Sequence, residues 1–486
     1  MLFNSIEFVF FFIIVTGAFF LLPHKFRWVL LLVASCFFYM FFKPIYILIL
    51  GFTIVIDYYA GILLENEPDK AKKKRYLVMS LVANIGVLAV FKYFNFFNDN
   101  ITSVAEYMGY KNPIPYLSIL LPIGLSFHTF QAMSYTIEVY RGNQRAERHF
   151  GIYSLYVMFY PQLVAGPIER PQNVLHQFHE VQTFKYDNVV SGLRLMLWGM
   201  FKKVVIADRL AVVTDMVFSD PHHHSSVAIA IGAVMFAFQI FCDFSGYSDI
   251  ALGSARVMGF KLMLNFDRPF NSKSVTEFWR RWHISLSTWF NDYLFNPIVV
   301  GLRNWGTMAI VFGLLITFFI SGFWHGAGWK FVIYGVLNGL ALVYEYLTRK
   351  KRKKLFKKLP VPVANAIGKF CTVGFIAFSW IFFRAENVSD ALYMVGRLPG
   401  VFTEIPQMIS SRHFSTGIQL APMRMLLCVA LILFMEGVHM LQGKYDVVQL
   451  VERRPVAVRW GIYYVLVLAI LYLGMFNNKE FIYFQF

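Results

Sequence analysis

Charged residues are scarce in this chain. Asp, Glu, Lys and Arg make up 15% of its 486 residues, while 57% of the residues are hydrophobic and the mean hydropathy is +0.54. Soluble domains average about 25% charged residues, so this composition excludes an ordinary soluble protein and a disordered chain. Apolar runs of about 20 residues recur, each long enough to cross a hydrocarbon core roughly 30 Å thick. We therefore predict an all-α polytopic membrane protein.

Cysteine and the usual catalytic signatures are also scarce. The four cysteines (Cys36, Cys242, Cys371 and Cys428) lie in apolar surroundings without CxxC or CxH spacing, which argues against a disulfide framework or a zinc site. We expect them to act as small core residues. The run His222–His224 has no framework of Cys or carboxylate ligands, so we predict a solvated loop and no metal site. Walker A, GxSxG and HExxH motifs are absent from the sequence.

The apolar segments predict about 11–14 transmembrane or interfacial helices in one membrane domain, 1–486, which ends in an aromatic tail, 477–486. Two long segments are interrupted by Gly, Asp or Lys, so each is expected either to form two shorter helices or to lie partly in the interface. Residues 384–422 are expected to form an outer loop that contains the short amphipathic run NVSDALYMVGRL. The segments lie near 3–23, 27–43, 44–64, 76–97, 115–138, 150–168, 187–216, 225–258, 306–323, 327–348, 362–383, 423–440 and 460–476.

The net charge of +17 does not indicate nucleic-acid binding, because the basic residues cluster in short loops. Basic loops of membrane proteins face the cytoplasm, so residues 70–75 and 349–358 are predicted to be cytoplasmic. Three apolar segments precede the first block, which puts the N-terminus outside. The basic loop 444–459 is followed by one more segment, so the C-terminus is also predicted to be extracytoplasmic.

Polar residues inside apolar segments are costly and mark candidate functional sites. The stretch FCDFSGYSDIALGSARVMGF, 241–260, contains Asp243, Ser245, Tyr247 and Asp249. Gly246 would break the helix and let backbone groups line a polar cavity. Alternatively, the two carboxylates bond to helix ends or pair with nearby arginines.

A second stretch, TEFWRRWHISLSTWFNDYLF (276–295), is amphipathic. One set of residues recurs at three-to-four spacing and is predicted to lie on related faces of a helix: Trp279, Trp282, His283, Leu286 and Trp289. Arg280 and Arg281 are candidates to bind phosphates or lipid head groups at the cytoplasmic surface. The alternative is an interfacial helix without a catalytic role.

The third stretch, ISGFWHGAGWKFVIYGVLNGL (320–340), places His325 between two strongly apolar segments, among Gly322, Gly326 and Gly328. Small residues permit close helix approach. An imidazole titrates near neutral pH and would serve as a general base, although a structural histidine is the alternative. Composition and spacing alone predict only a membrane protein with two histidines in a polar core, a description that a transporter also fits.

Long ordered strings throughout the chain resemble the membrane-bound O-acyltransferase superfamily, and most closely its bacterial alginate O-acetyltransferase branch. The strings include WHGAGW (324–329), RRWHISLSTW (280–289), LLPIGLSFHTFQAMSYTIEVYRG (120–142), YPQLVAGPIERP (160–171), DFSGYSDIALGSARVMGF (243–260) and the opening MLFNSIEFVFFF. The resemblance implies a helical fold in which a funnel and a tunnel meet near His325. It implies that His325 is catalytic and that His283 fills a second polar position, occupied by His or Asn across the superfamily. Trp282 and Trp324, beside these histidines, join the predicted substrate-binding residues.

The resemblance also implies a reaction. The expected acyl donor is acetyl-CoA, presented as a thioester from the cytoplasm, with no bound cofactor. The expected acceptor is an extracytoplasmic polysaccharide of the alginate, cellulose or peptidoglycan type, reached through an SGNH-type partner outside a bacterial inner membrane. The alternatives are D-alanyl transfer to teichoic acid and transport of an activated sugar or lipid.

The tail FIYFQF resembles a C-terminal motif of these systems, in which a tyrosine is proposed to relay the acyl group. Tyr483 would be the counterpart here, because a phenol with a pKa of about 10 forms a more reactive ester than an alkyl alcohol does. Flanking Phe481, Phe484 and Phe486 would dock the tail into an apolar opening. The alternative is an aromatic belt that anchors the last helix.

Overall fold

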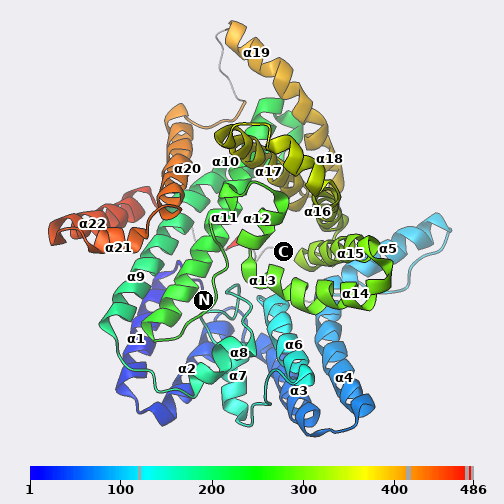
Figure 1. Cartoon of the computed structure of the whole chain (residues 1–486), viewed down its shortest axis with the longest axis vertical. Coiled ribbons are helices and arrows are strands. Elements are labelled where there is room, and N and C mark those ends of the chain that lie inside the picture. Colours follow the sequence, from blue (N-terminus) through cyan, green and yellow to red (C-terminus); the bar gives the residue numbers. More distant parts are fainter. Residues whose placement is uncertain (119–121, 412–416, 477–480, 483–486) are drawn as a thin grey trace.

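A computed structural model describes residues 1–118, 122–411, 417–476 and 481–482. All regular elements of these residues are helices, which confirms the predicted fold class (Figure 1). The first half contains α1 (Ile6–Leu21), α2 (His24–Met40), α3 (Ile47–Asn66), α4 (Lys70–Leu88), α5 (Phe94–Tyr107), α6 (Leu125–Arg141), α7 (Phe150–Met158), α8 (Pro171–Val174), α9 (Tyr186–Met200), α10 (Asp208–Ser219) and α11 (Ser226–Val257). The second half contains α12 (Val275–Arg281), α13 (Ile284–Phe290), α14 (Asn296–Gly301), α15 (Thr307–His325), α16 (Trp329–Phe356), α17 (Val361–Arg384), α18 (Val388–Arg397), α19 (Val401–Ser411), α20 (Pro422–Gln442), α21 (Val447–Glu452) and α22 (Val456–Leu473).

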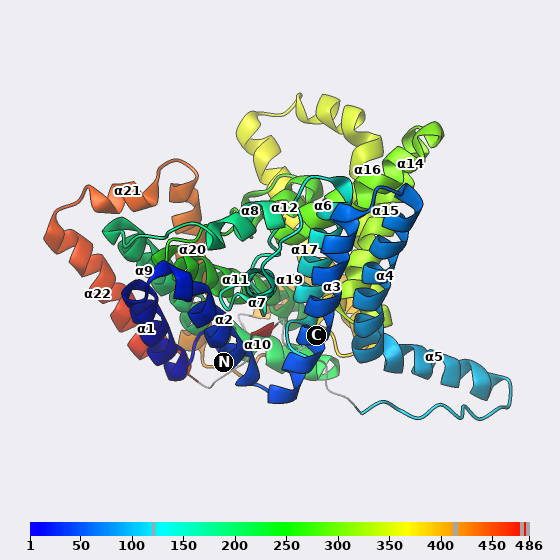
Figure 2. The same ribbon diagram turned by 90° about the horizontal axis from the view of Figure 1, so that it is seen from below.

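Eight helices among the described residues are long and apolar enough to cross a membrane, so the chain is a multi-pass membrane protein. These candidate spans are Pro44–Asn66, Lys70–Tyr107, Ser226–Val257, Thr307–His325, Trp329–Phe356, Val361–Arg384, Pro422–Gln442 and Val456–Leu473. In α22 only Ile470 is buried, and both views place α21 and α22 at the edge of the molecule (Figure 2). By contrast, α11 is the most buried span and passes through the centre.

The predicted break at Gly246 is wrong, because α11 runs without interruption from Ser226 to Val257. A Cβ atom on Gly246 would lie 2.7 Å from the carbonyl oxygen of Gly199 on α9, and a Cβ on Gly199 would lie 2.6 Å from the carbonyl oxygen of Gly246. Two glycines therefore let the backbones of α9 and α11 touch. Gly246 serves this close packing, and it does not open the helix.

Segment 187–216 is also continuous, but its middle is wound differently. A π-helical segment, η4 (Phe201–Ala207), joins α9 directly to α10. Its side chains are all buried, including those of Lys202 and Lys203. Insertions of this kind occur frequently at functional sites, because they re-aim side chains and release backbone groups. Two similar segments, η2 (Ala89–Tyr93) and η7 (Asn291–Phe295), lie beside the site described below.

Two further predictions need correction. The segment 150–168 is helical only to Met158, since Pro161, Gly166 and Pro167 interrupt the chain that follows. Within residues 384–422, the amphipathic run forms α18, whose N-terminus Asn387 caps, and a second helix, α19, follows that the sequence did not predict. Among the cysteines, Cys242 and Cys428 are buried as expected, whereas Cys371 is exposed.

Candidate functional site

His325 is the last residue of α15, at the tip of a hairpin formed with α16. The hairpin is unusually close, because a Cβ on Gly335 would lie 2.3 Å from the carbonyl oxygen of Phe318, and a Cβ on Gly322 would lie 2.3 Å from that of Phe331. The small residues noted in the sequence therefore have a packing function. They fix the direction in which α15 delivers its final residue.

Aromatic rings enclose the imidazole of His325, which is 5% exposed. The ring centroid of Phe383 lies 5.3 Å away and that of Tyr334 lies 6.0 Å away. The indole of Trp380 donates a hydrogen bond to the hydroxyl of Tyr334, which orients that ring. His325 is thus buried among mostly aromatic side chains, where polar interactions are strong.

The ammonium group of Lys92 caps the end of α15. It donates hydrogen bonds to the carbonyl oxygens of Trp324 (2.7 Å) and His325 (3.1 Å). The last carbonyls of a helix have no partners within the helix, and a cation there complements the helix dipole. Lys92 belongs to the π-helical segment η2, in a candidate membrane span. A buried lysine therefore fixes the backbone on which His325 sits.

His283 lies at a break in the segment that the sequence predicted as one helix. The prediction is wrong at this point, since α12 ends at Arg281, and His283 has a left-handed backbone with φ of 42°. Such a φ is uncommon for residues other than glycine. Asn265 supports the turn: its carbonyl oxygen accepts a bond from the N–H of Ile284, and its side-chain oxygen accepts one from the hydroxyl of Ser285 (2.6 Å).

The two histidines approach the same tryptophan. The ring centroid of Trp324 lies 6.3 Å from that of His283 and 4.9 Å from that of His325. His283 is fully buried and lies outside the eight candidate spans. Its burial, together with the neighbouring His325 ring, holds the pKa of His283 well below its ordinary value. His283 is therefore neutral at pH 7, with one nitrogen that donates and one that accepts.

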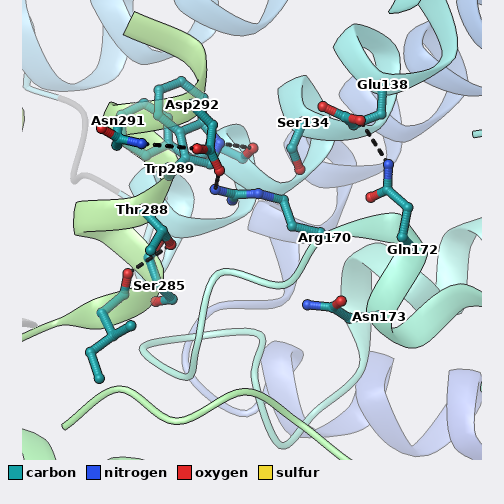
Figure 3. Close-up of polar contacts among 12 residues, drawn as sticks. Ser134, Glu138, Arg170, Gln172, Asn173, Ser285, Thr288, Trp289, Asn291 and Asp292 are labelled. Atoms are coloured by element: carbon teal, nitrogen blue, oxygen red, sulfur yellow. Dashed lines mark hydrogen bonds and ion pairs between the residues drawn. The ribbon is translucent and has the colours of Figure 1, made fainter. Parts of the chain in front are cut away.

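A stack of three aromatic rings connects Trp324 of α15, through α6, to α13. Phe130 of α6 lies between Trp324 and Trp289, with centroid distances of 5.2 Å and 4.0 Å. The Trp289 indole donates to the carbonyl oxygen of Phe130, and Arg170 forms an ion pair with Asp292 directly beyond it (Figure 3). These contacts brace α13 and η7 against α6, so the surroundings of both histidines form one rigid unit.

The two predicted phosphate-binding arginines differ in their surroundings. Arg281 forms ion pairs with Glu277 (2.8 Å) and Asp267. Arg280 is exposed and lines a pocket of about 480 Å³ between α12, α13, α15 and α16. The pocket reaches Ser321, one turn before His325 on α15. It offers Arg280, but not Arg281, to a ligand.

Three of the predicted polar residues of α11 form ion pairs or hydrogen bonds with lysine side chains of the chain itself. Asp249 pairs with Lys202 at 2.8 Å, and the same ammonium group donates to the hydroxyl of Ser245. Asp243 pairs with Lys203 at 2.6 Å. The partners are thus lysines of η4, and not the arginines that the sequence alternative named.

Two of the remaining candidates, Tyr247 and Trp282, pack against aromatic rings. Tyr247 is buried against Phe481 of the C-terminal segment, with centroids 4.7 Å apart, and Trp282 lies beside Trp380. Asn338 of α16 accepts a hydrogen bond from the indole N–H of Trp279. Tyr483, Phe484 and Phe486 lie outside the described residues.

Sequence reasoning missed several residues that build the site. Lys92, Lys202 and Lys203 are charged side chains within apolar stretches, so the cost of a charge in a membrane was a usable signal. Asn265 gave no comparable signal, because its role depends on a turn that the sequence did not predict.

The histidines of the loop 222–224 do contact carboxylates, with His222 at 3.3 Å from Asp390 and His223 at 2.7 Å from Asp220.

Comparison with known proteins places these features in a family. A family model described as "MBOAT, membrane-bound O-acyltransferase family" matches residues 55–385, which include both histidines. The chain is 35% identical to a probable alginate O-acetylase AlgI of Pseudomonas aeruginosa, over 81% of this chain and 74% of that protein. It is 34% identical to a peptidoglycan O-acetyltransferase of Helicobacter pylori, over 76% of this chain and 73% of the relative.

A more distant match is the teichoic acid D-alanyltransferase of Streptococcus thermophilus, which is 30% identical over 55% of this chain and 69% of that protein. The family model covers well over half of the sequence, and the alginate and peptidoglycan relatives match most of both chains. The chain therefore belongs to the membrane-bound O-acyltransferase family and is an integral membrane O-acyltransferase.

Proposed function

We propose that this protein moves an acetyl group from cytoplasmic acetyl-CoA across the membrane toward the O-acetylation of an extracytoplasmic polysaccharide. The observation that carries the proposal is the meeting of His325 and His283 around Trp324 in a rigid, buried setting. The names of relatives that act on alginate and peptidoglycan support acetyl as the transferred group and a polysaccharide as the final acceptor.

The proposed donor route uses the pocket that Arg280 lines. Arg280 lies in the last turn of α12, and Thr276 in the first turn lines the same pocket. Glu345 of α16 caps the N-terminus of α12 by accepting hydrogen bonds from the N–H groups of Val275 and Thr276, both at 2.9 Å. Glu345 lies one helical turn before the basic block 349–358, which we predict to be cytoplasmic. The pocket therefore opens on the side from which coenzyme A arrives, and its inner end approaches His325.

The chemistry is base-assisted acyl transfer. A hydroxyl oxygen attacks the thioester carbonyl carbon while its proton passes to the neutral imidazole of His325, and the C–S bond breaks as the thiolate leaves and takes up a proton. His283, also neutral, supplies an N–H that orients the donor or polarises its carbonyl. In this proposal Tyr483 provides the accepting phenol, and an SGNH-type partner outside the membrane receives the acetyl group from it.

D-alanyl transfer is the second candidate. The D-alanyl relative matches a smaller share of this chain than the acetyl-transferring relatives do, and the opening and LPIGLSFHTFQ strings resemble the alginate branch. We therefore favour acetyl.

The test is the acetyl content of surface polysaccharide in cells that carry only a variant protein. We expect His325→Ala to lower it at least about 100-fold, the usual contribution of a general base, with the variant still present in the membrane. Unchanged acetylation in that strain would remove the catalytic role of His325. Purified protein supplied with acetyl-CoA or D-alanyl thioester separates the two donors, and transfer of D-alanine alone would contradict the acetyl proposal.

A further inference from the structure

The C-terminal segment of the chain enters the interior of the protein. Phe481 is 1% exposed and Ile482 is 5% exposed. The aromatic-belt alternative requires rings at the lipid interface, and Phe481 does not lie there. Two residues near the end of the chain thus lie in a buried site that needs an explanation.

The site is built around a charged cluster in the middle of α11 and η4. The ammonium group of Lys203 lies 2.6 Å from the carboxylate of Asp243 and 2.9 Å from that of Asp208, and all three side chains are buried. Charges at such a position are costly, and an ion pair seldom repays that cost through stability alone. A functional ligand is a better reason for keeping them.

The second carboxylate oxygen of Asp243 binds the tail. The backbone N–H of Ile482 donates to Oδ2 of Asp243 at 2.6 Å, while Oδ1 accepts from Lys203. Lys203 also lies 4.6 Å from the ring centroid of Phe481, within reach of a cation–π interaction. The same ring also contacts that of Tyr247, with an interplanar angle of 89°.

The π-helical winding of η4 provides a further attachment point. The carbonyl oxygen of Val204 accepts a hydrogen bond from the N–H of Met475, directly after α22. Arg209 donates to the carbonyl oxygen of Leu473. The chain that leaves α22 is therefore tied to η4 and α10 at its start, and to Lys203 and Asp243 at Phe481 and Ile482.

We propose that the cluster of Lys203, Asp243 and Asp208 is a docking site for the chain's own C-terminal segment, in which Asp243 binds the N–H of Ile482 and positions the residue that follows. That residue is Tyr483, so this inference rests on the proposed function. The neighbouring residue on α11, Phe244, has its ring 4.7 Å from that of His283. One turn of α11 thus contacts both the tail and the candidate site. Asp243 is a positioning residue, and it takes no part in the chemistry.

The direct test is photo-crosslinking in the full-length protein, purified in nanodiscs, with benzoylphenylalanine at position 481. We expect crosslinks to peptides that contain Lys203 or Tyr247. Ile482→Pro removes the donating N–H without changing the buried ion pairs, and we expect it to lower the yield of those crosslinks about tenfold, since hydrogen bonds to charged groups are strong. Asp243→Ala should act in the same way.

Asp249→Asn is the matched control, because its carboxylate pairs with Lys202 on the same helices and does not contact the described part of the tail. We expect it to leave the crosslinks to Lys203 and Tyr247 in place. Full crosslink yield in Ile482→Pro, or crosslinks only to lipid in the parent protein, would overturn the docking site.

An activity measurement separates this inference from the proposed function. Ile482→Pro is expected to lower polysaccharide acetylation, and Tyr483→Phe to abolish it while the crosslinks persist. Normal acetylation with Tyr483→Phe would rule out Tyr483 as the acyl acceptor, but it would not contradict the docking site. Normal acetylation with Ile482→Pro, together with blocked transfer in Tyr483→Phe, would show that Tyr483 accepts the acyl group without needing the docking site, and would overturn the positioning role of Asp243.

Discussion

At the scale of single residues, the site depends on one residue whose backbone is held in a costly conformation. His283 has a positive φ that residues other than glycine seldom adopt, and strain of this kind concentrates at functional sites. Asparagine tolerates this region, whereas a β-branched residue does not. The backbone and the chemistry at position 283 can therefore be separated by substitution.

We expect His283→Asn to keep the thermal stability of the protein in detergent and to keep part of the acetyl transfer, because the amide of asparagine also donates an N–H. We expect His283→Val to lose about 1–3 kcal/mol of folding stability, the usual cost of a strained backbone. Thermal unfolding and acetyl transfer of both variants check this. Equal stability of the two variants would show that the left-handed turn is not a constraint.

Lys92 is the second residue whose contribution can be isolated. Lys92→Met keeps the length of the side chain but removes the donors to the carbonyl oxygens of Trp324 and His325. We expect acetyl transfer to fall about tenfold, since a bond to a charged group contributes about 1.5–3 kcal/mol. Lys92→Arg restores a donor and should recover part of the rate. If Lys92→Met transfers acetyl at the parental rate, Lys92 does not position His325.

At the scale of elements, glycines decide how closely the helices approach. A side chain on Gly335 has no space against α15, whereas a Cβ on Gly374 of α17 would meet nothing within 4 Å. The two glycines lie in candidate membrane helices of similar composition and differ in their neighbours. They form a matched pair for testing the α15–α16 hairpin.

We expect Gly335→Ala to destabilise the protein and to lower transfer, because the new methyl group would collide with the Phe318 carbonyl. We expect Gly374→Ala to be neutral or to stabilise by up to roughly 1 kcal/mol, the difference in helix propensity. Unfolding in detergent measures both. A stable, active Gly335→Ala would mean that the hairpin tolerates a wider separation.

At the scale of the whole molecule, the sequence predicted the helical membrane fold and the buried histidines but not the local geometry. Hydropathy depends on composition, so it identified α3, α15, α17 and α20 closely, while α16 continues eight residues beyond the predicted end at 348. The break at His283 depends on Asn265, which is distant in sequence, and the intact α11 depends on Gly199 packing against Gly246. Contacts between distant segments leave no periodic signal, and this is why the two predictions failed.

The orientation of the whole molecule is a further prediction. Lys353 lies in the basic block and Gln407 lies on α19 in the segment 384–422, and both are exposed. In a Cys371→Ser background, we expect an impermeant thiol reagent to label Gln407→Cys in intact spheroplasts, and Lys353→Cys only after permeabilisation. The reverse labelling pattern would show that the basic block lies outside, and it would contradict the proposed cytoplasmic entry of the acyl donor.

The central claim is that acetyl passes from the thioester to the C-terminal tyrosine under the control of His325. Mass analysis of the C-terminal peptide, after incubation of the purified protein with acetyl-CoA, tests it most directly. We expect an acetyl ester on Tyr483 in the parent protein and none in His325→Ala. An unmodified Tyr483 in the active parent, or equal acetylation of Tyr483 without His325, would contradict the account.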